Sequence, residues 1–308
     1  MKYTVIKTTD TAALRPFLNT LVIPKAASHK GQNGRALIIG GSRLFHAASL
    51  WAAETVSHFV DITHYSSTVE NNAVFLALKK QFRNGIIVEH KDIPWYINED
   101  DAILIGPGMV RGEFDKSHVS ENQTFADILN LSDEALFSRA ITNYLLTNFP
   151  AKKFVLDAGA LQMMDPAWLL LMKEKPIITP HQLEFEKLFS TEIVSLSVDE
   201  KVKLVQETAS KYNCVILLKA VVDIISDGTN TYVIEGGNQG LTKGGTGDTL
   251  AGLVLSFFAK TDALTSAVMA SYVLKKASDD LSQTHGYWYN VENLIEKIPT
   301  ILKNILYN

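Results

Sequence analysis

The chain has 308 residues, of which 46% are hydrophobic and 20% charged, a composition typical of a globular protein with a sizeable core. Its formal net charge is −4 and Lys and Arg are not gathered into a dense patch, which argues against nucleic acid as a main partner. The N-terminal MKYTVIKTTD lacks the apolar segment of a signal peptide, and no apolar stretch approaches the ~20 residues of a membrane span, so we expect a cytoplasmic protein without a membrane partner.

Short apolar runs alternate with helix-like segments along most of the chain. Residues 1–30 are expected to form an N-terminal helix and an extended arm on the outside of the fold. Several of the apolar runs that follow show no alternation, as expected of strands covered on both faces. The predicted strands are 35–41, 60–66, 85–90, 102–106, 153–158, 176–179 and 214–219. The predicted helices between them are 47–59, 71–83, 123–130, 133–147, 166–173, 181–189 and 199–212.

The pattern changes after residue 222. The run DIISDGTNTYVIEGG predicts two strands about an Asp-Gly turn, a hairpin at the edge of the sheet, and helices are predicted at 248–259, 262–281 and 291–306. The alternation predicts an α/β fold: a mostly parallel central sheet with helices on both faces and an edge hairpin. Since no linker, repeat or low-complexity run interrupts it, we expect one domain over residues 1–308.

Residues 241–252, LTKGGTGDTLAG, lead from a glycine run through a single carboxylate into a predicted helix. Glycines permit positive φ and close approach of backbone N–H groups to a ligand, and the first turn of a helix favours anions such as phosphate. Because Asp248 would repel phosphate, its position predicts chemistry: it can take a proton from a hydroxyl during phosphoryl transfer. Capping of the helix by Asp248 is a second, compatible interpretation. The run is not a Walker A loop, because no Lys-Ser/Thr follows its last glycine.

Four further stretches have the character of ligand-facing loops. They are the Gly-Gly-Ser at 40–42, the Gly-Pro-Gly at 106–108, Asp157 in VLDAGAL, and TPHQLE at 179–184, where His181 and Glu184 begin a predicted helix. Each follows a predicted strand, and the carboxyl ends of parallel strands meet at one edge of a sheet, where ligands bind. The four stretches and the glycine run are therefore predicted to form one site.

The motifs HKG..G…GG, GPG, TPH..E and GGTGD.LAG, in this order and at these spacings, resemble those of the ADP- or ATP-dependent NAD(P)H-hydrate dehydratases, which have the ribokinase-like fold. The similarity covers roughly residues 25–285. It implies an enzyme that repairs hydrated nicotinamide cofactors. ADP or ATP, accompanied by Mg²⁺, phosphorylates the hydroxyl of the hydrated ring, and phosphate is then eliminated to restore NADH or NADPH. A homo-oligomer is also expected.

The resemblance implies roles for individual residues. Asp248 would be the catalytic base and would contact the substrate, and Ala48, Gly108 and His181 would line the pocket for the hydrated cofactor. Two segments would bind the nucleotide, with no residue assigned to a metal: Lys219, Ala220, Val221, Val222 and Asp223, and Gly244, Gly245, Thr246 and Gly247.

The chain departs from the pattern of this family at three places. The family usually has Lys-Gly-Ala-x-Thr at residues 219–223, Asp-Ala-Asp at 157–159, and Gly-Ala after an aromatic, where Phe45-His46-Ala47-Ala48 stands here. Asp223 adds a negative charge near the expected phosphates, and we expect Lys219 or a metal to screen it. The departures at Ala47, Gly159, Ala220 and Asp223 leave two alternatives open. One is a small-molecule kinase acting on a vitamin precursor or sugar, and the other is a nucleotide-binding relative without activity.

Other reactive residue types are interpreted as structural. Cys214, in the apolar run CVILLK, is expected to be a buried thiol of a protein from a reducing compartment. His46, His58 and His64 do not repeat with the spacing of metal ligands, and no spacing singles out Glu70.

Overall fold

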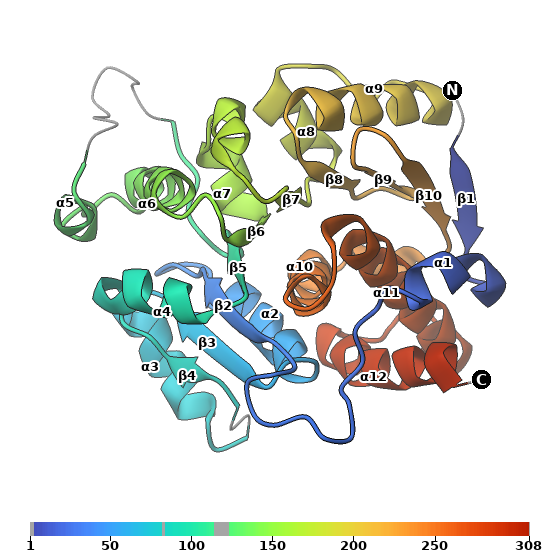
Figure 1. The fold of residues 1–308 in the computed structure, drawn as a ribbon, viewed down its shortest axis with the longest axis horizontal. Helices are drawn as coiled ribbons and strands as arrows, with labels where there is room; N and C mark the ends of the chain where they lie inside the picture. The colour runs from blue at the N-terminus through green and yellow to red at the C-terminus, as the bar shows by residue number, and fades with distance from the viewer. Residues whose placement is uncertain (1–2, 82–83, 114–122, 308) are drawn as a thin grey trace.

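The computed structural model describes residues 3–81, 84–113 and 123–307. The strands in these ranges form one ten-stranded sheet in the order β1-β10-β9-β8-β7-β6-β5-β2-β3-β4 (Figure 1). From β8 to β4 neighbours run parallel, β9 is antiparallel to both of its neighbours, and β1 is parallel to β10. The strands are β1 Thr4–Lys7, β2 Arg35–Ile39, β3 Ile62–Ser66, β4 Ile86–Ile87, β5 Ala102–Ile105, β6 Lys153–Leu156, β7 Ile177–Ile178, β8 Val215–Leu218, β9 Asp223–Ser226 and β10 Thr231–Glu235.

Helices cover both faces of the sheet (Figure 1). On one face α2, α10, α11 and α12 enclose a core that includes Val254, and on the other α4, α6, α7, α8 and α9 enclose a core that includes Ile141. The helical segments are η1 Thr11–Leu14, α1 Arg15–Leu18, α2 Ala47–Ser57, α3 Val69–Leu78, η2 His90–Asp92, α4 Ile93–Glu99, α5 Phe125–Leu129, α6 Glu134–Asn148, α7 Ala158–Met163, η4 Pro166–Leu171, α8 Gln182–Phe189, α9 Val198–Lys211, η5 Gln239–Thr242, α10 Thr246–Phe258, α11 Ala263–His285 and α12 Val291–Tyr307.

The central strands explain why their sequences are apolar without alternation. In β5 every residue is buried, but successive side chains enter opposite cores: Ala102 and Leu104 belong to one, Ile103 and Ile105 to the other. Side chains of a strand alternate between faces, so a strand covered twice must be apolar at each position. The predicted α/β fold, mostly parallel with helices on both faces, is thus confirmed.

Two other expectations were tested by the fold. Cys214 is fully buried, as predicted, and burial raises the pKa of its thiol to about 12. Among the described residues, no helix is long and apolar enough to cross a membrane.

The fold differs from the prediction at its N-terminal edge. Residues 4–7 form β1, which pairs with β10, so the β9–β10 hairpin lies one strand inside the edge of the sheet rather than at it. The prediction missed β1 because a four-residue strand with one buried side chain, Ile6, carries almost no pattern. It also missed α4 and α7. The predicted helix 71–83 ends as α3 at Leu78, with 82–83 outside the described residues.

Candidate active site

The loops that were predicted to share one edge of the sheet do lie side by side there. Backbone hydrogen bonds join each loop to the next: Gly41 N to Pro107 O (2.7 Å), Asp157 N to Ile105 O (3.1 Å), Thr179 N to Leu156 O (3.1 Å) and Lys219 N to Pro180 O (2.8 Å). The carboxyl ends of β2, β5, β6, β7 and β8 therefore present these loops in one row. This is the edge at which open α/β sheets bind ligands.

The glycine run forms the start of α10. Gly245 is the N-cap residue, with a φ of 98°, and a Cβ there would lie 2.5 Å from the ring of Trp51. Only glycine fits both constraints without strain. Gly244 and Gly247 do not have positive φ. A Cβ at Gly244 would meet nothing within 4 Å, and a Cβ at Gly247 would lie 3.5 Å from Lys219 Nζ. The backbone requirement for glycine is therefore confined to Gly245.

Asp248 lies in the first turn of α10, two residues after the helix begins. The interpretation that it is the N-cap is wrong, because Gly245 holds that position and makes no side-chain cap. The carboxylate instead faces the cluster formed by Lys219, Asp157 and Glu184, whose charges all act on it. Its place in the first turn brings it to the same edge of the sheet as the strand ends.

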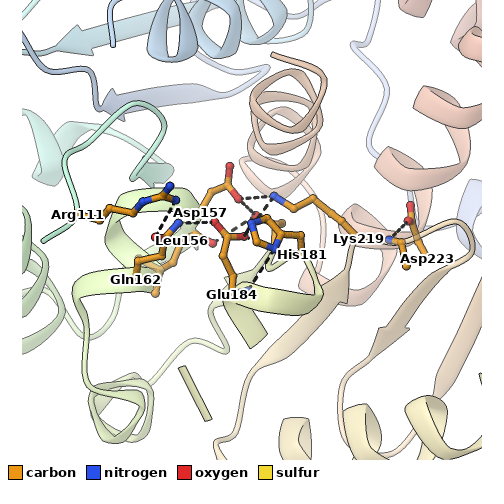
Figure 2. Close-up of polar contacts among 10 residues, drawn as sticks. Arg111, Leu156, Asp157, Gln162, His181, Glu184, Lys219 and Asp223 are labelled. Carbon is orange, nitrogen blue, oxygen red and sulfur yellow. Dashed lines mark hydrogen bonds and ion pairs between the residues drawn. The ribbon is translucent and has the colours of Figure 1, made fainter. Parts of the chain in front are cut away.

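Lys219 lies at the centre of this cluster. Its Nζ donates to Asp157 Oδ1 at 2.8 Å and lies 4.0 Å from Glu184 Oε2, and Figure 2 shows the ammonium directed toward Asp157. Asp157 also accepts a hydrogen bond from the Thr179 hydroxyl at 2.8 Å. Burial opposes the charge on Lys219, but the carboxylates outweigh it and raise the pKa of the ammonium, so Lys219 is a cation.

One ammonium thus faces three carboxylates, and Asp248 is the one without a direct ion pair. Burial, and then the negative charge of Asp157, raise the pKa of Asp248 to about 7, while Lys219 pulls it down. A carboxyl group whose pKa lies near neutrality is suited to exchange a proton with a substrate hydroxyl. The cluster therefore supplies both the position and the basicity that a general base needs.

A cavity of about 100 Å³ adjoins the cluster. It is lined by five of the residues predicted to bind the nucleotide, Lys219, Ala220, Asp223, Thr246 and Gly247, together with α11 side chains. The other predicted residues lie elsewhere. Gly244 is exposed, Gly245 is buried as the cap, Val221 is 92% exposed, and Val222 packs against the core on the other face of the sheet.

Asp223 is not screened as the sequence suggested. Its Oδ1 accepts from Ala220 N at 3.0 Å and lies 3.5 Å from Lys275 Nζ, and its Oδ2 accepts from the Ser271 hydroxyl at 2.7 Å. The expectation of screening by Lys219 is wrong, since Lys219 points away toward Asp157 (Figure 2) and the cation beside Asp223 is Lys275. The departure from the family pattern at this position is thus accommodated inside the protein.

The residues predicted to line the substrate pocket fall into two groups along the same edge. Gly108, with a φ of 72°, lies against α2, where a Cβ would be 3.2 Å from the Cβ of Ala48. His181 caps α8: its Nδ1 accepts from Glu184 N at 3.2 Å, and Glu184 Oε2 accepts from His181 N at 2.9 Å. His181 also bridges to Lys219 in the sheet, and its side chain is 47% exposed, so it borders the cluster.

The absence of a side chain at position 159 also has a structural reason. A Cβ on Gly159 would lie 2.3 Å from the carbonyl oxygen of Met109, a distance that real Cβ atoms do not reach. The second carboxylate of the family pattern therefore has no room here unless the loop after β5 moves. Sequence reasoning noted the missing carboxylate but could not see this approach, because Met109 and Gly159 lie on different strand ends.

Two residues of the cluster were not predicted to have a role. Glu184 and Thr179 were noted only as parts of TPHQLE, yet they supply a carboxylate and a hydroxyl to the cluster. The signal that could have found Glu184 is its place three residues after His181, a capping-box spacing that turns its side chain back toward the strand end. Among the described residues, no group of three or more His, Cys, Asp or Glu could hold a metal ion.

Comparison with known families and proteins adds to this geometry. A family model described as NAD(P)H-hydrate dehydratase matches residues 36–300. The bifunctional NAD(P)H-hydrate repair enzyme Nnr of Methanocaldococcus jannaschii is 33% identical over 282 residues, which are 90% of this chain and 49% of that protein. The ADP-dependent (S)-NAD(P)H-hydrate dehydratase of Nitrosopumilus maritimus is 28% identical over 303 residues, 96% of this chain and 97% of that protein. The chain thus spans about half of the bifunctional relative.

Solved structures with the same fold include two bacterial proteins. A ribokinase-like superfamily protein of Enterococcus faecalis superposes with a TM-score of 0.77 at 22% identity, covering 99% of this chain and 97% of that one. The ADP/ATP-dependent NAD(P)H-hydrate dehydratase of Bacillus subtilis, co-crystallised with ATP and Mg²⁺, gives 0.75 at 22% identity, covering 94% and 96%. These likenesses show the ribokinase-like fold.

Proposed function

Because this chain belongs to the NAD(P)H-hydrate dehydratase family, we propose that it restores NADH or NADPH from their hydrated forms in a nucleotide-dependent reaction. The phosphoryl donor would be ADP or ATP, and relatives that match nearly their whole length are named ADP-dependent. The observation that supports this most is Asp248, a carboxyl group with a pKa of about 7 in the first turn of α10, close to the largely buried ammonium of Lys219.

The first step of the proposed reaction joins the hydroxyl of the hydrated ring to phosphorus. Ionised Asp248 accepts the hydroxyl proton while the oxygen attacks the terminal phosphorus of the nucleotide, and the shortened nucleotide leaves. The N-terminus of α10 stabilises the charge on the phosphoryl oxygens. Gly245 permits this approach because it turns the chain without a side chain.

The second step removes the phosphate. The bond between the ring carbon and the phosphate oxygen breaks and phosphate leaves, a proton passes from the neighbouring carbon to water, and the ring double bond returns. Lys219 is placed to balance the negative charge that accumulates between phosphate and the three carboxylates, since it is a cation held by Asp157. In this proposal Ala48, Gly108 and His181 border the hydrated ring, and Lys219, Ala220, Asp223, Thr246 and Gly247 border the nucleotide.

Magnesium would arrive with the nucleotide. The described residues offer no site of three or more protein ligands, which fits the preference of Mg²⁺ for phosphate oxygens, water and one or two carboxylates. When bound, Mg²⁺ would neutralise phosphate charge.

Two further proposals concern the protein's state in the cell. We propose that it acts in the cytoplasm, because the substrate derives from reduced nicotinamide cofactors and because a buried, unpaired Cys214 is compatible with a reducing compartment. We also propose a homo-oligomer, in which a partner subunit would cover exposed apolar side chains such as Leu44, 73% exposed, and Trp288, 85% exposed. Light scattering at several protein concentrations tests this; a monomer throughout would contradict it.

The activity is tested by incubating hydrated NADH or hydrated NADPH with the protein, Mg²⁺, and ADP or ATP. The proposal predicts recovery of the absorbance of the reduced nicotinamide, with one phosphate released per cofactor restored. Accumulation of a stable phosphorylated product from another alcohol would instead identify a small-molecule kinase. Nucleotide binding without turnover of either hydrate would identify a non-catalytic relative.

A further inference from the structure

A second cavity, of about 250 Å³, lies at the same edge of the sheet, between the N-terminal ends of α3 and α6. It shares the turn at Gly40 and Gly41 and the residue Met109 with the row of loops described above. A Cβ at Gly108 would lie 3.2 Å from the Cα of Gly41, so the cavity begins where the predicted substrate-lining residues end. A hydrated dinucleotide is much longer than its nicotinamide ring, and its other end needs a place along this edge.

The chemistry of the cavity suits an aromatic base. Its wall includes Val110, Leu131 and Phe137, and the ring of His90 stacks on Phe137 with centroids 5.0 Å apart and planes at 24°. Burial lowers the pKa of His90 to about 4, so the imidazole is neutral at physiological pH. A neutral imidazole both donates and accepts hydrogen bonds and offers a stacking surface, but it gives no charge to a phosphate.

The rim of the cavity is acidic. Two helices begin there, and the donors that could bind a phosphate at the start of α6 are taken: Asp133 Oδ1 accepts from Ala135 N at 2.8 Å and from Leu136 N at 2.9 Å. Glu134 in the first turn of α6 and Glu70 in the first turn of α3 also line the cavity.

Arg43 is the cation that these carboxylates share. It approaches Glu70 with its Nε, at 3.7 Å, but it gives Glu134 only its backbone N–H, at 3.0 Å. Its side chain is 71% exposed and that of Glu70 is 55% exposed, so solvent weakens the interaction between them. Two carboxylates therefore face the cavity against one screened guanidinium.

We propose that this cavity binds the adenosine end of the hydrated dinucleotide, and that Glu70 and Glu134 select the free 2′,3′-diol of hydrated NADH over the 2′-phosphate of hydrated NADPH. Carboxylates accept hydrogen bonds from a ribose diol and repel a phosphate. The inference rests on the proposed function, because it assigns a place to the far end of that substrate.

The test compares kcat/KM for hydrated NADH and hydrated NADPH in the wild type and in the double variant Glu70→Gln, Glu134→Gln. We expect the wild type to prefer hydrated NADH by about tenfold, as one unscreened pair of like charges at about 6 Å would give at an effective dielectric constant of about 40. The preference should arise from KM, and the double variant should lose most of it. The control, Glu54→Gln, changes a carboxylate of a different cavity and should keep the preference.

Binding separates this inference from the proposed function. If neither hydrate is turned over, calorimetry with NADH and NADPH still decides: tighter binding of NADH that is lost in the double variant supports the inference although the proposed function fails. Equal kcat/KM for the two hydrates, or a preference for NADH that survives in the double variant, overturns the inference while turnover upholds the proposed function. No binding of either dinucleotide also overturns it.

Discussion

Two lysines with little exposure, Lys219 (19%) and Lys275 (5%), line the same cavity, and their surroundings differ in one respect. Lys275 lies 3.5 Å from one carboxylate, Asp223, and also donates to the carbonyl of Val221 at 3.0 Å. Every polar atom of that pair has a partner within the protein. Lys219 instead faces three carboxylates and pairs directly with Asp157, so Asp248 remains uncompensated.

The difference indicates that Asp223 and Lys275 form a structural ion pair, whereas the cluster around Lys219 leaves one carboxyl group able to take part in chemistry. A buried charge whose polar atoms all have partners within the protein holds the loop in place. A buried carboxyl group left over from such a pair has a pKa near 7 and can exchange a proton with a ligand. In the loop after β8, Asp223, which departs from the family pattern, thus forms a structural ion pair with Lys275. The same loop positions Lys219 beside the carboxyl group that can exchange a proton.

The largest expected effect is the loss of turnover when Asp248 is replaced. Asp248→Asn keeps the shape of the side chain but removes the proton acceptor, so turnover of hydrated NADH should fall by about 10²–10⁴-fold, the usual contribution of a general base. The matched control is Asp223→Asn, assayed below its melting temperature, which should keep kcat at saturating nucleotide within about threefold of the wild type, because the amide oxygen can still accept one of the hydrogen bonds from Ala220 N and Ser271. Similar losses in both variants would mean that the two clusters do not differ in role.

Replacing the lysine of each pair should change a different quantity: protein stability for Lys275 and the pH dependence of turnover for Lys219. Lys275→Met leaves Asp223 buried without its ion pair and should lower the free energy of unfolding by about 3–5 kcal/mol. It should leave the pH dependence of turnover unchanged. Lys219→Met should instead raise the pKa of Asp248, because Lys219 lowers that pKa, and shift the acidic limb of activity to higher pH. Denaturant titrations and pH profiles of both variants measure this; an acidic limb moved by Lys275→Met would contradict it.

The glycine run offers a sharper comparison within a single turn. Gly245→Ala must adopt a φ of 98° and meets the Trp51 ring, so ADP or ATP should bind about 10–100-fold more weakly, for a strain of about 1–3 kcal/mol. Gly244→Ala is the matched control, because its Cβ would meet nothing within 4 Å. Calorimetry should show an affinity within about twofold of wild type for the control. Equal affinities for both variants would show that Gly245 serves only helix entry.

The smallest effect is on stability, and its sign follows from the raised pKa. The pKa of Asp248 rises from 3.8 to about 7 on folding, so ionisation of this group reduces stability progressively between about pH 4 and pH 7, has its full cost above pH 7, and has no effect well below pH 4. Asp248→Asn should therefore stabilise the protein at pH 8 by about 2 kcal/mol, roughly half of what the full shift would give because the site still reaches water. The gain should vanish toward pH 4. Melting curves at both pH values test this; a destabilised variant at pH 8 would contradict it.

The sequence predicted the parts of the site that depend on local pattern. Apolar strands covered on both faces were identified because β5 and β8 are apolar throughout, and the loops after β2 and β5 were identified by their glycines. Asp248 was found because a lone carboxylate after glycines is unusual at a helix start. The predicted roles of these residues stay proposals.

What the sequence could not supply depends on contacts between distant segments. Lys275 is 52 residues from Asp223 in the sequence, and no motif around Lys275 marks it as the partner of that carboxylate. The close approach of Gly159 to Met109, the pairing of Lys219 with Asp157, and the strand β1 likewise depend on where segments meet. The cavity rimmed by Glu70 escaped notice because its carboxylates come from separate helices.

The most direct test of the account is the pH dependence of kcat/KM for hydrated NADH at saturating nucleotide. This quantity reports groups that titrate in the enzyme before the hydrate binds. If Asp248 is the base, kcat/KM should fall tenfold per pH unit on the acidic side, with an apparent pKa near 7. A rate that stays constant from about pH 8 down to about pH 5 would show that no group with the pKa of Asp248 takes part, and would contradict the account.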